Sequence, residues 1–90
     1  MDPTEDVFMR ISVIGLGKLG APAAAVFAAK GHDVIGLDVN ITLVNALRAG
    51  KATVEEPRLQ EMIDAGQPRL TATADYNDLV KASDLTFVIV

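Results

Sequence analysis

The sequence predicts an α/β domain built on a parallel sheet with helices on both faces. Short apolar runs alternate along the chain with longer segments in which apolar residues recur at helical spacing. The first run, Arg10–Ile14, lacks polar alternation, which is typical of a parallel strand that is covered on both sides. Glycine and proline punctuate the segments, as expected where short loops join strands to helices.

The composition indicates one globular domain. Of its 90 residues, 50% are hydrophobic and 22% are charged. The net charge of −4 argues against nucleic acid or an anionic membrane as a partner. The absence of cysteine excludes a disulfide, a thiolate metal site and a cysteine nucleophile within these residues. No apolar run approaches the roughly 18 residues of a membrane span, so we expect a cytoplasmic protein.

The first half of the chain predicts two strands joined by a helix. Residues 1–9 form a polar lead-in that we expect to be flexible, and the folded domain spans residues 10–90. The strand Arg10–Ile14 leads into a helix over Lys18–Lys30, whose many alanines allow close approach to a sheet. The second strand is expected at Asp33–Leu37. The single histidine, His32, has no ligand-like neighbour, and we expect it to pack in a loop.

The second half predicts three more helices and two more strands. Asn40 is suited to cap a helix that ends at Gly50, and Pro57 is suited to the first position of the next helix. The third strand is polar enough to lie at a sheet edge. The remaining expected elements are a helix over Pro57–Ala65, a strand over Arg69–Thr73, a helix over Asp75–Lys81 and a strand over Leu85–Val90.

Right-handed crossovers between these strands predict the spatial order 3-2-1-4. The chain ends at Val90, at the close of an apolar strand whose edge would present unpaired backbone groups. We therefore expect a sheet truncated after its fourth strand, with the substrate site in the missing part of a larger protein. The exposed edge would also let a homo-oligomer form by strand pairing.

Three glycines spaced G-x-G-x-x-G follow the first strand directly. Gly15 permits a tight turn, Gly17 lets the backbone approach a pyrophosphate, and Gly20 lets the next helix pack closely. The N–H groups at the start of that helix would face the phosphates. The alternative is a purely structural turn. Because the motif lies between a strand and a helix, and an acidic residue ends the next strand, we favour a dinucleotide site of the Rossmann type.

Asp38 is that acidic residue. Its carboxylate can accept hydrogen bonds from both hydroxyls of an adenosine ribose, and its charge would repel the 2′-phosphate of NADP. No lysine or arginine between Val39 and Leu47 offsets the charge. We therefore expect NAD as the cofactor. The alternative role for Asp38 is that of a capping or loop carboxylate before Asn40.

Several segments together resemble the UDP-glucose/GDP-mannose dehydrogenase family. The glycine motif and Asp38 occur in many dehydrogenases, whereas the run from Gly-His-Asp-Val to Asp-Val-Asn, followed by Ala-Gly-Lys and Glu-Pro-x-Leu, is much more specific. The likeness covers residues 10–90, which would be the N-terminal part of a family member. The matching segments are Gly15–Pro22, Lys30–Asn40, Leu47–Lys51, Glu56–Leu59 and Asp84–Val90.

The resemblance implies NAD-dependent oxidation of the C6 alcohol of a UDP- or GDP-sugar to a carboxylate, through a thiohemiacetal on a cysteine. That cysteine and its helpers would lie outside this chain, which should not turn over substrate alone, and we expect no catalytic residue and no metal here. The resemblance assigns cofactor contacts only. The pyrophosphate would contact Gly15, Leu16, Gly17, Lys18, Leu19 and Gly20, the ribose would contact Asp38, and Val90 would open the segment that lines the cofactor cleft.

The chain departs from the family pattern at several positions. Lys18 and Leu19 replace a tyrosine and a valine inside the glycine motif, and Lys18 either reaches a phosphate or is solvated. Leu43 stands where a basic residue often helps to hold the ribose. Glu55 and Arg58 replace a tyrosine and a glycine on either side of the Glu-Pro pair.

Two other functions remain open from the sequence. One is a non-catalytic NAD-sensing module, and the other is the cofactor domain of a 6-phosphogluconate or hydroxyacid dehydrogenase. An additional helix entered through Glu-Pro, in the Lys51–Gln60 region, would favour a dehydrogenase over a sensor.

Overall fold

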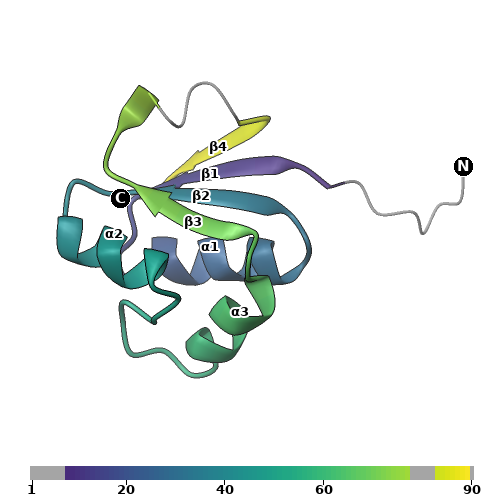
Figure 1. The fold of residues 1–90 in the computed structure, drawn as a ribbon, viewed down its shortest axis with the longest axis vertical. Coiled ribbons are helices and arrows are strands. Elements are labelled where there is room, and N and C mark those ends of the chain that lie inside the picture. The colour runs from purple at the N-terminus through teal and green to yellow at the C-terminus, as the bar shows by residue number, and fades with distance from the viewer. Residues whose placement is uncertain (1–7, 78–82, 90) are drawn as a thin grey trace, which may run out of the picture.

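The computed structural model describes residues 8–77 and 83–89, whose four strands form one parallel sheet of order β3-β2-β1-β4. The expected strand order is thus confirmed. Helices α1, α2 and α3 lie together against one face of the sheet (Figure 1). In chain order the elements are β1 (Arg10–Ile14), α1 (Gly20–Ala29), β2 (Asp33–Leu37), α2 (Ile41–Arg48), α3 (Leu59–Gly66), β3 (Leu70–Thr73) and β4 (Leu85–Val88).

The strands are aligned so that their carboxyl ends meet along one edge of the sheet. Ile14, the last residue of β1, pairs with Leu37 at the end of β2 and with Val88 at the end of β4. Leu37 in turn pairs with Thr73 at the end of β3. The turns that follow the strands therefore lie side by side at the edge where parallel α/β sheets bind their ligands.

Small residues let α1 pack closely against its neighbours. Its alanines at positions 21, 24, 25 and 28 are fully buried. Where α3 meets α1, a Cβ added to Gly66 would lie only 2.6 Å from the Cβ of Ala28. Glycine at position 66 is therefore required for the two helices to approach this closely.

Arg69, just before β3, joins the carboxyl-terminal ends of two helices. Its guanidinium donates to the carbonyl oxygen of Ala28 in α1, from Nε at 3.1 Å and from Nη2 at 2.9 Å. Nη2 also donates to the carbonyl oxygen of Ala65 in α3, at 2.9 Å. A positive charge is favourable at a helix carboxyl terminus, where the last carbonyl groups lack partners within the helix. One side chain therefore stabilises both ends.

The third helix begins two residues later than the sequence predicts. The N–H of Leu59 donates to the carbonyl oxygen of Glu56 at 3.2 Å, which closes a four-residue turn. Arg58, the third residue of this turn, has φ 68° and ψ 3°, as expected in a type II turn with Pro57 at its second position. The expectation that Pro57 opens the helix is therefore wrong, because Arg58 adopts a left-handed conformation that no α-helix can contain.

Several other expectations can be compared with the structure. Asn40 caps α2 through a hydrogen bond from the N–H of Thr42 to its side-chain oxygen, at 3.0 Å. β3 lies at a sheet edge, as its polar sequence predicts. Asp75 accepts the N–H of Asn77 at 2.9 Å, as expected of a cap. The rest of the helix expected to run to Lys81 falls mostly on residues 78–82, which lie outside the described part of the chain.

Phe8 and Met9 are anchored against the loop after α1. The N–H of Met9 donates to Nδ1 of His32 at 3.0 Å. The rings of Phe8 and Phe27 approach the imidazole edge-on, with centroid distances of 6.2 and 6.4 Å. His32 thus packs in a loop, as expected, and connects the lead-in to the domain from Phe8 onward.

Polar contacts attach the start of β4 to β1. The hydroxyl of Ser12, which is fully buried, is hydrogen-bonded to that of Ser83. The carboxylate of Asp84 accepts the backbone N–H of Arg10 at 2.9 Å and its Nη2 at 3.3 Å. These hydrogen bonds, the backbone one foremost, hold the pKa of Asp84 below its usual value of 3.8.

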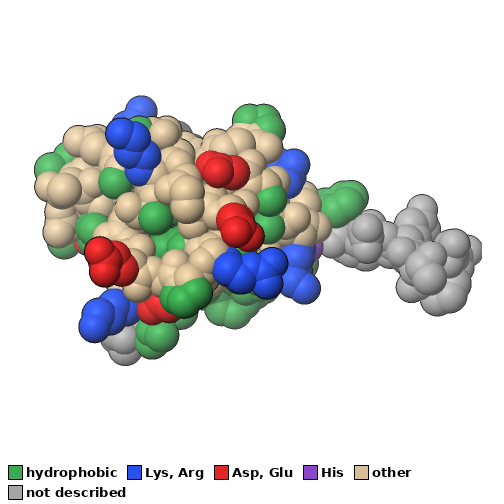
Figure 2. Space-filling model, turned by 90° about the horizontal axis from the view of Figure 1, so that it is seen from below, with side chains coloured by type: hydrophobic (Ala, Val, Ile, Leu, Met, Phe, Trp, Pro, Cys, Tyr) green, Lys and Arg blue, Asp and Glu red, His purple; other side chains and the backbone are tan. Residues whose placement is uncertain are grey.

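The face formed by the helices carries charges of both signs. Figure 2 shows Lys and Arg side chains interspersed with Asp and Glu side chains and with hydrophobic ones across this face. No helix within residues 8–77 and 83–89 is long and apolar enough to cross a membrane.

Replacing Arg58 with glycine should stabilise the domain by about 0.5 to 1 kcal/mol, measured by urea denaturation. The left-handed conformation costs a non-glycine residue roughly 1 to 2 kcal/mol, and the freedom of glycine in the unfolded chain offsets part of the gain. Arg58→Ala is the matched control, because it also removes the exposed ion pair with Glu61 but keeps the unfavourable backbone conformation. If the glycine variant is no more stable than the alanine variant, the turn is assigned incorrectly.

Asp84 should make the stability of the domain depend on acid pH. Because the folded pKa lies below 3.8, the ionised carboxylate stabilises the fold above that pH, and this contribution is lost as the pH falls through the folded pKa. The advantage of the wild-type chain over Asp84→Asn in free energy of unfolding should therefore shrink between about pH 7 and about pH 2. Denaturation curves at a series of pH values test this, and a constant difference would contradict it.

Candidate functional site

The turn after β1 takes its shape from two glycines. Gly15 has a φ of 99°, in the left-handed region, and its N–H donates to the carbonyl oxygen of Leu37 at 2.8 Å. Gly20 stands directly against this turn, so that an added Cβ would overlap the carbonyl oxygen of Gly15. The helix expected from Lys18 therefore begins at Gly20, because residues 17–19 form the turn that brings α1 this close to β1.

Gly17 is not required by the fold. Apart from its two neighbours in the chain, no described atom would lie within 4 Å of a Cβ built on Gly17. The φ angle of Gly17 also lies outside the left-handed region. Neither packing nor backbone conformation in the described chain therefore demands a glycine here. The space in front of Gly17 is open to solvent, as direct contact between this backbone and a pyrophosphate would need.

The amino-terminal end of α1 presents free hydrogen-bond donors beside that space. Within the described ranges, the N–H groups of Gly17, Lys18, Leu19 and Gly20 donate no hydrogen bond, and no side chain caps the helix at Leu19. The first N–H groups of a helix lack partners within the helix and carry a partial positive charge. Lys18, which is exposed beside them, adds a full positive charge. This arrangement suits a phosphate group.

Asp38 is fixed to the glycine turn by its carboxylate. Oδ2 accepts the N–H of Leu16 at 2.9 Å, and Oδ1 accepts the N–H of Asn40 at 2.8 Å. The contact with Asn40 is the loop role considered as an alternative. It does not exclude binding of ribose hydroxyls, because each carboxylate oxygen has a second lone pair. The two N–H groups hold the carboxylate at the carboxyl edge of the sheet.

A cavity of about 480 Å³ brings most of the predicted site residues together, and we name it the glycine-turn cavity. Ile89, which lies just after β4 beside Gly15, also lines the cavity, although no sequence motif marks it as a site residue. Ile89 could have been predicted only from the pairing of β4 with β1, because this pairing brings the residue after β4 next to the glycine turn. The residues that line the cavity are Gly15, Gly17, Lys18, Leu19, Gly20, Asp38 and Ile89.

Other predicted residues lie elsewhere. Leu16 is fully buried, and its side chain packs so closely against β2 that a Cβ on Gly36 would lie 2.6 Å from its Cδ2. Contact between Leu16 and a cofactor would therefore have to involve its backbone. Val90 lies outside the described residues. Leu43 packs against the core and supplies no charge to replace the basic residue that is common in the family.

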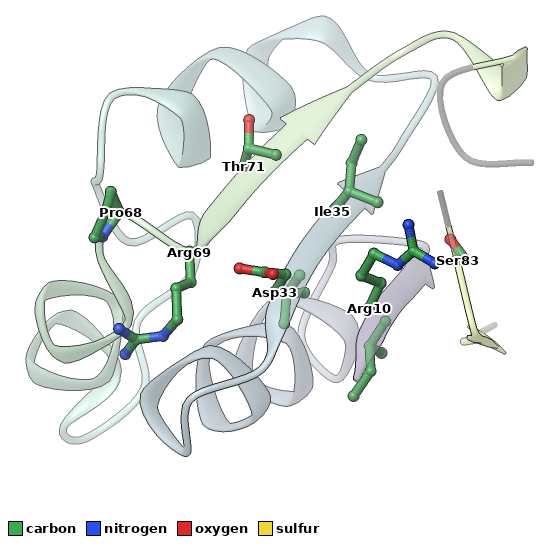
Figure 3. A pocket seen from close by; sticks show the side chains of 9 residues that line it. Arg10, Asp33, Ile35, Pro68, Arg69, Thr71 and Ser83 are labelled. Carbon is green, nitrogen blue, oxygen red and sulfur yellow. The ribbon is translucent and has the colours of Figure 1, made fainter. Parts of the chain in front are cut away.

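A second cavity, of about 300 Å³, is less suited to a dinucleotide. Figure 3 shows it on the sheet, with the side chains of Asp33, Ile35 and Thr71 rising from β2 and β3. Two of its lining residues, Arg10 and Asp33, are the first residues of β1 and β2, so the cavity lies toward the amino ends of the strands. Parallel sheets bind ligands at the opposite end. The glycine-turn cavity is therefore the candidate site.

Comparison with known proteins agrees with this geometry. Residues 9–90 match the profile of the UDP-glucose/GDP-mannose dehydrogenase family, NAD binding domain. A UDP-glucose 6-dehydrogenase of Haloferax volcanii is 42% identical over 82 residues, which cover 89% of this chain and 19% of that protein.

Two solved structures share the fold closely. One is a ternary complex of a Pseudomonas aeruginosa GDP-mannose dehydrogenase, with a TM-score of 0.87 and 40% identity over 91% of this chain and 19% of that one. The other is a UDP-glucose dehydrogenase from Pyrobaculum islandicum, with a TM-score of 0.87 and 37% identity over all of this chain and 21% of that one. The chain thus spans about a fifth of the length of the relatives that it matches.

Proposed function

The chain belongs to the UDP-glucose/GDP-mannose dehydrogenase family, as its NAD-binding domain, and on this premise we propose that the glycine-turn cavity holds the pyrophosphate and adenosine ribose of NAD. The observation that carries the proposal is Gly17. It is the glycine of the motif that neither the packing nor the backbone of the described chain requires, and it faces open space beside free N–H donors. A bound pyrophosphate accounts for both properties.

Each remaining residue of the site has a role in this proposal. The N–H groups of residues 17–20 donate to phosphate oxygens, and the ammonium of Lys18 adds attraction for the negative charge. Leu19 covers the cofactor from the exposed side, and Leu16 takes part through its backbone. Val90 lies outside the described residues, and the resemblance alone assigns it to the start of the segment that lines the cofactor cleft. When bound, NAD supplies a nicotinamide ring that accepts a hydride from the substrate.

Asp38 selects the cofactor in this proposal. Its carboxylate is already held in place by two backbone N–H groups, so it accepts the ribose hydroxyls without rearranging. The same negative charge disfavours the 2′-phosphate of NADP. Leu43 provides no positive charge to reverse this preference.

We further propose that the protein containing this domain oxidises the C6 alcohol of a UDP- or GDP-sugar to a carboxylate. The support is the match to the family and the names of the relatives, among them a UDP-glucose 6-dehydrogenase. The chain has no cysteine, so the nucleophile that the resemblance implies would lie in the rest of such a protein. A cytoplasmic location is part of this proposal.

The structure favours a dehydrogenase over an NAD-sensing module. Helix α3 (Leu59–Gly66) is present, and it is entered through the Glu56-Pro57 turn. Gln60 ties this helix to the preceding loop, since its side chain donates to the carbonyl oxygen of Gly50 at 2.8 Å and accepts the N–H of Ala52 at 2.9 Å. This is the additional helix expected of the dehydrogenase.

Replacing Gly17 with alanine should weaken NAD binding roughly tenfold or more, because the new methyl group occupies the approach of the pyrophosphate. The free energy of unfolding should change by less than about 0.5 kcal/mol, since the methyl group meets no other atom. Calorimetric titration and urea denaturation measure the two quantities.

The wild-type chain should bind NADP much more weakly than NAD.

Gly20→Ala provides the contrast within the same motif. Its methyl group overlaps the carbonyl oxygen of Gly15, so the variant should lose about 3 kcal/mol of stability or more. If Gly17→Ala binds NAD as tightly as the wild-type chain, the pyrophosphate does not lie against this turn.

The proposed homo-oligomer would associate through the edge of β4. β4 lies at an edge of the described sheet, and Leu85 and Val88 are 41% and 64% exposed. Association through this edge would raise the sedimentation coefficient with protein concentration, and Val88→Lys should suppress the rise, because edge lysines oppose strand pairing. A monomer at every concentration would contradict this surface.

A further inference from the structure

The peptide group between Leu16 and Gly17 lies at the centre of the candidate site. Its N–H, that of Gly17, donates no hydrogen bond within the described residues and is a donor proposed to meet the pyrophosphate. Its carbonyl oxygen, that of Leu16, accepts from the hydroxyl of Thr53 at 3.5 Å. One peptide group therefore connects the proposed phosphate site to a residue 37 positions further along the chain.

The geometry of a peptide group couples these two contacts. The group is planar, and in the trans form, which this one has, the C=O and the N–H point in opposite directions. A carbonyl that faces Thr53 therefore directs the N–H of Gly17 away from Thr53. Gly17 is exposed and lines the glycine-turn cavity, whereas Thr53 is half-buried and does not line it. The hydroxyl thus contacts the turn from behind, and the N–H is left toward the open space.

Little else holds this peptide group in place. Within residues 8–77 and 83–89, the hydroxyl of Thr53 is the one hydrogen-bond donor to the Leu16 carbonyl. Asp38 accepts the N–H of Leu16, which belongs to the preceding peptide group. Because Gly17 has no Cβ, its backbone rotates more freely than that of other residues. If the group turned over, the carbonyl oxygen would face the phosphate and repel it.

The loop that carries Thr53 is itself anchored. The neighbours of Thr53 in the chain, Ala52 and Val54, pack against the core. The N–H of Ala52 donates to Oε1 of Gln60 at 2.9 Å, and Nε2 of Gln60 donates to the carbonyl oxygen of Gly50 at 2.8 Å. Helix α3, which contains Gln60, therefore fixes the loop that presents Thr53 to the glycine turn.

The hydrogen bond from Thr53 is long. Hydroxyl donors usually lie about 2.7 to 2.8 Å from their acceptors, so a contact of 3.5 Å contributes little to the stability of the fold. An anion that accepts the N–H of Gly17 would polarise the peptide group and make the Leu16 carbonyl a stronger acceptor. The hydroxyl and the anion would then strengthen each other's hydrogen bonds.

From this arrangement, and resting on the proposed function, we propose that Thr53 is a positioning residue for the pyrophosphate. It acts through the peptide group between Leu16 and Gly17 and not by contact with the cofactor. Its hydroxyl keeps the N–H of Gly17 aimed at a phosphate oxygen and makes that N–H a better donor. The affinity for the cofactor thus depends on a residue outside the glycine motif.

Variants that differ in the hydroxyl test the proposal. Thr53→Val keeps the shape of the side chain but removes the donor, and it should weaken NAD binding roughly three- to tenfold in a calorimetric titration. Thr53→Ser keeps the donor and should retain most of the affinity. Thr71→Val is the matched control, because it removes the hydroxyl of an exposed residue of β3 that does not line the glycine-turn cavity, and it should leave the affinity unchanged.

The NMR spectrum of the labelled chain distinguishes positioning from a general effect on the fold. Saturating NAD should move the amide proton of Gly17 downfield, together with the carbonyl carbon of Leu16. In Thr53→Val at saturation both shifts should be smaller, while the shift of the Gly20 amide should match that of the wild-type chain. If the Leu16 carbonyl carbon of the wild-type chain stays unmoved while the Gly17 amide responds, the proposal is overturned without any variant.

The outcomes also separate this proposal from the one on which it rests. If Thr53→Val binds NAD as tightly as the wild-type chain while Gly17 responds, the positioning role is overturned and the pyrophosphate site stands. If Thr53→Ser binds as weakly as Thr53→Val, the hydroxyl is not responsible and the positioning role is again overturned. If Gly17 in the wild-type chain does not respond to saturating NAD, both proposals fail.

Discussion

The contact between Gly20 and the carbonyl group of Gly15 is the constraint on which the structure depends. It places the first turn of α1 directly against the end of β1, at a distance that no side chain at position 20 would permit. The alanines of α1 then meet the sheet along the length of the helix. The same contact fixes where the free N–H groups of residues 17–20 lie, beside the ends of β2 and β4. The packing of the core and the geometry of the candidate site thus have a common origin.

Asp38 extends this constraint from β1 to β2. Because it accepts the N–H of Leu16, the loop after β2 is tied to the glycine turn before any ligand arrives. The side chain of Leu16 adds an apolar connection, since it fills the space beside Gly36 in β2. A preorganised site loses less conformational entropy on binding, which favours affinity. Leu16 therefore influences the site from inside the core.

The strand order and much of the candidate site could be predicted from the sequence because they depend on local signals. The glycine spacing, the acidic residue after β2 and the cap at Asn40 each identify a backbone geometry. The start of α3 could not be predicted in this way, because Pro57 is equally suited to a helix and to a type II turn. Arg58 is an unusual residue for the left-handed position that distinguishes them.

The contribution of Ile89 depends on tertiary structure. Ile89 reaches the glycine turn because β4 pairs with β1 across more than seventy residues of sequence. No short sequence motif marks it as part of a site. Leu16 shows the reverse, since it lies inside the motif but its side chain belongs to the core.

The two ends of α1 differ in a way that links ligand binding to cooperativity. At the carboxyl end, the guanidinium of Arg69 ties the helix to α3, so neither helix can open locally without disrupting the other. At the amino end no side chain completes the helix. A phosphate bound there would act as the missing cap and would extend the cooperative unit to the first turn. Cofactor binding and the last step of helix formation would then be one event.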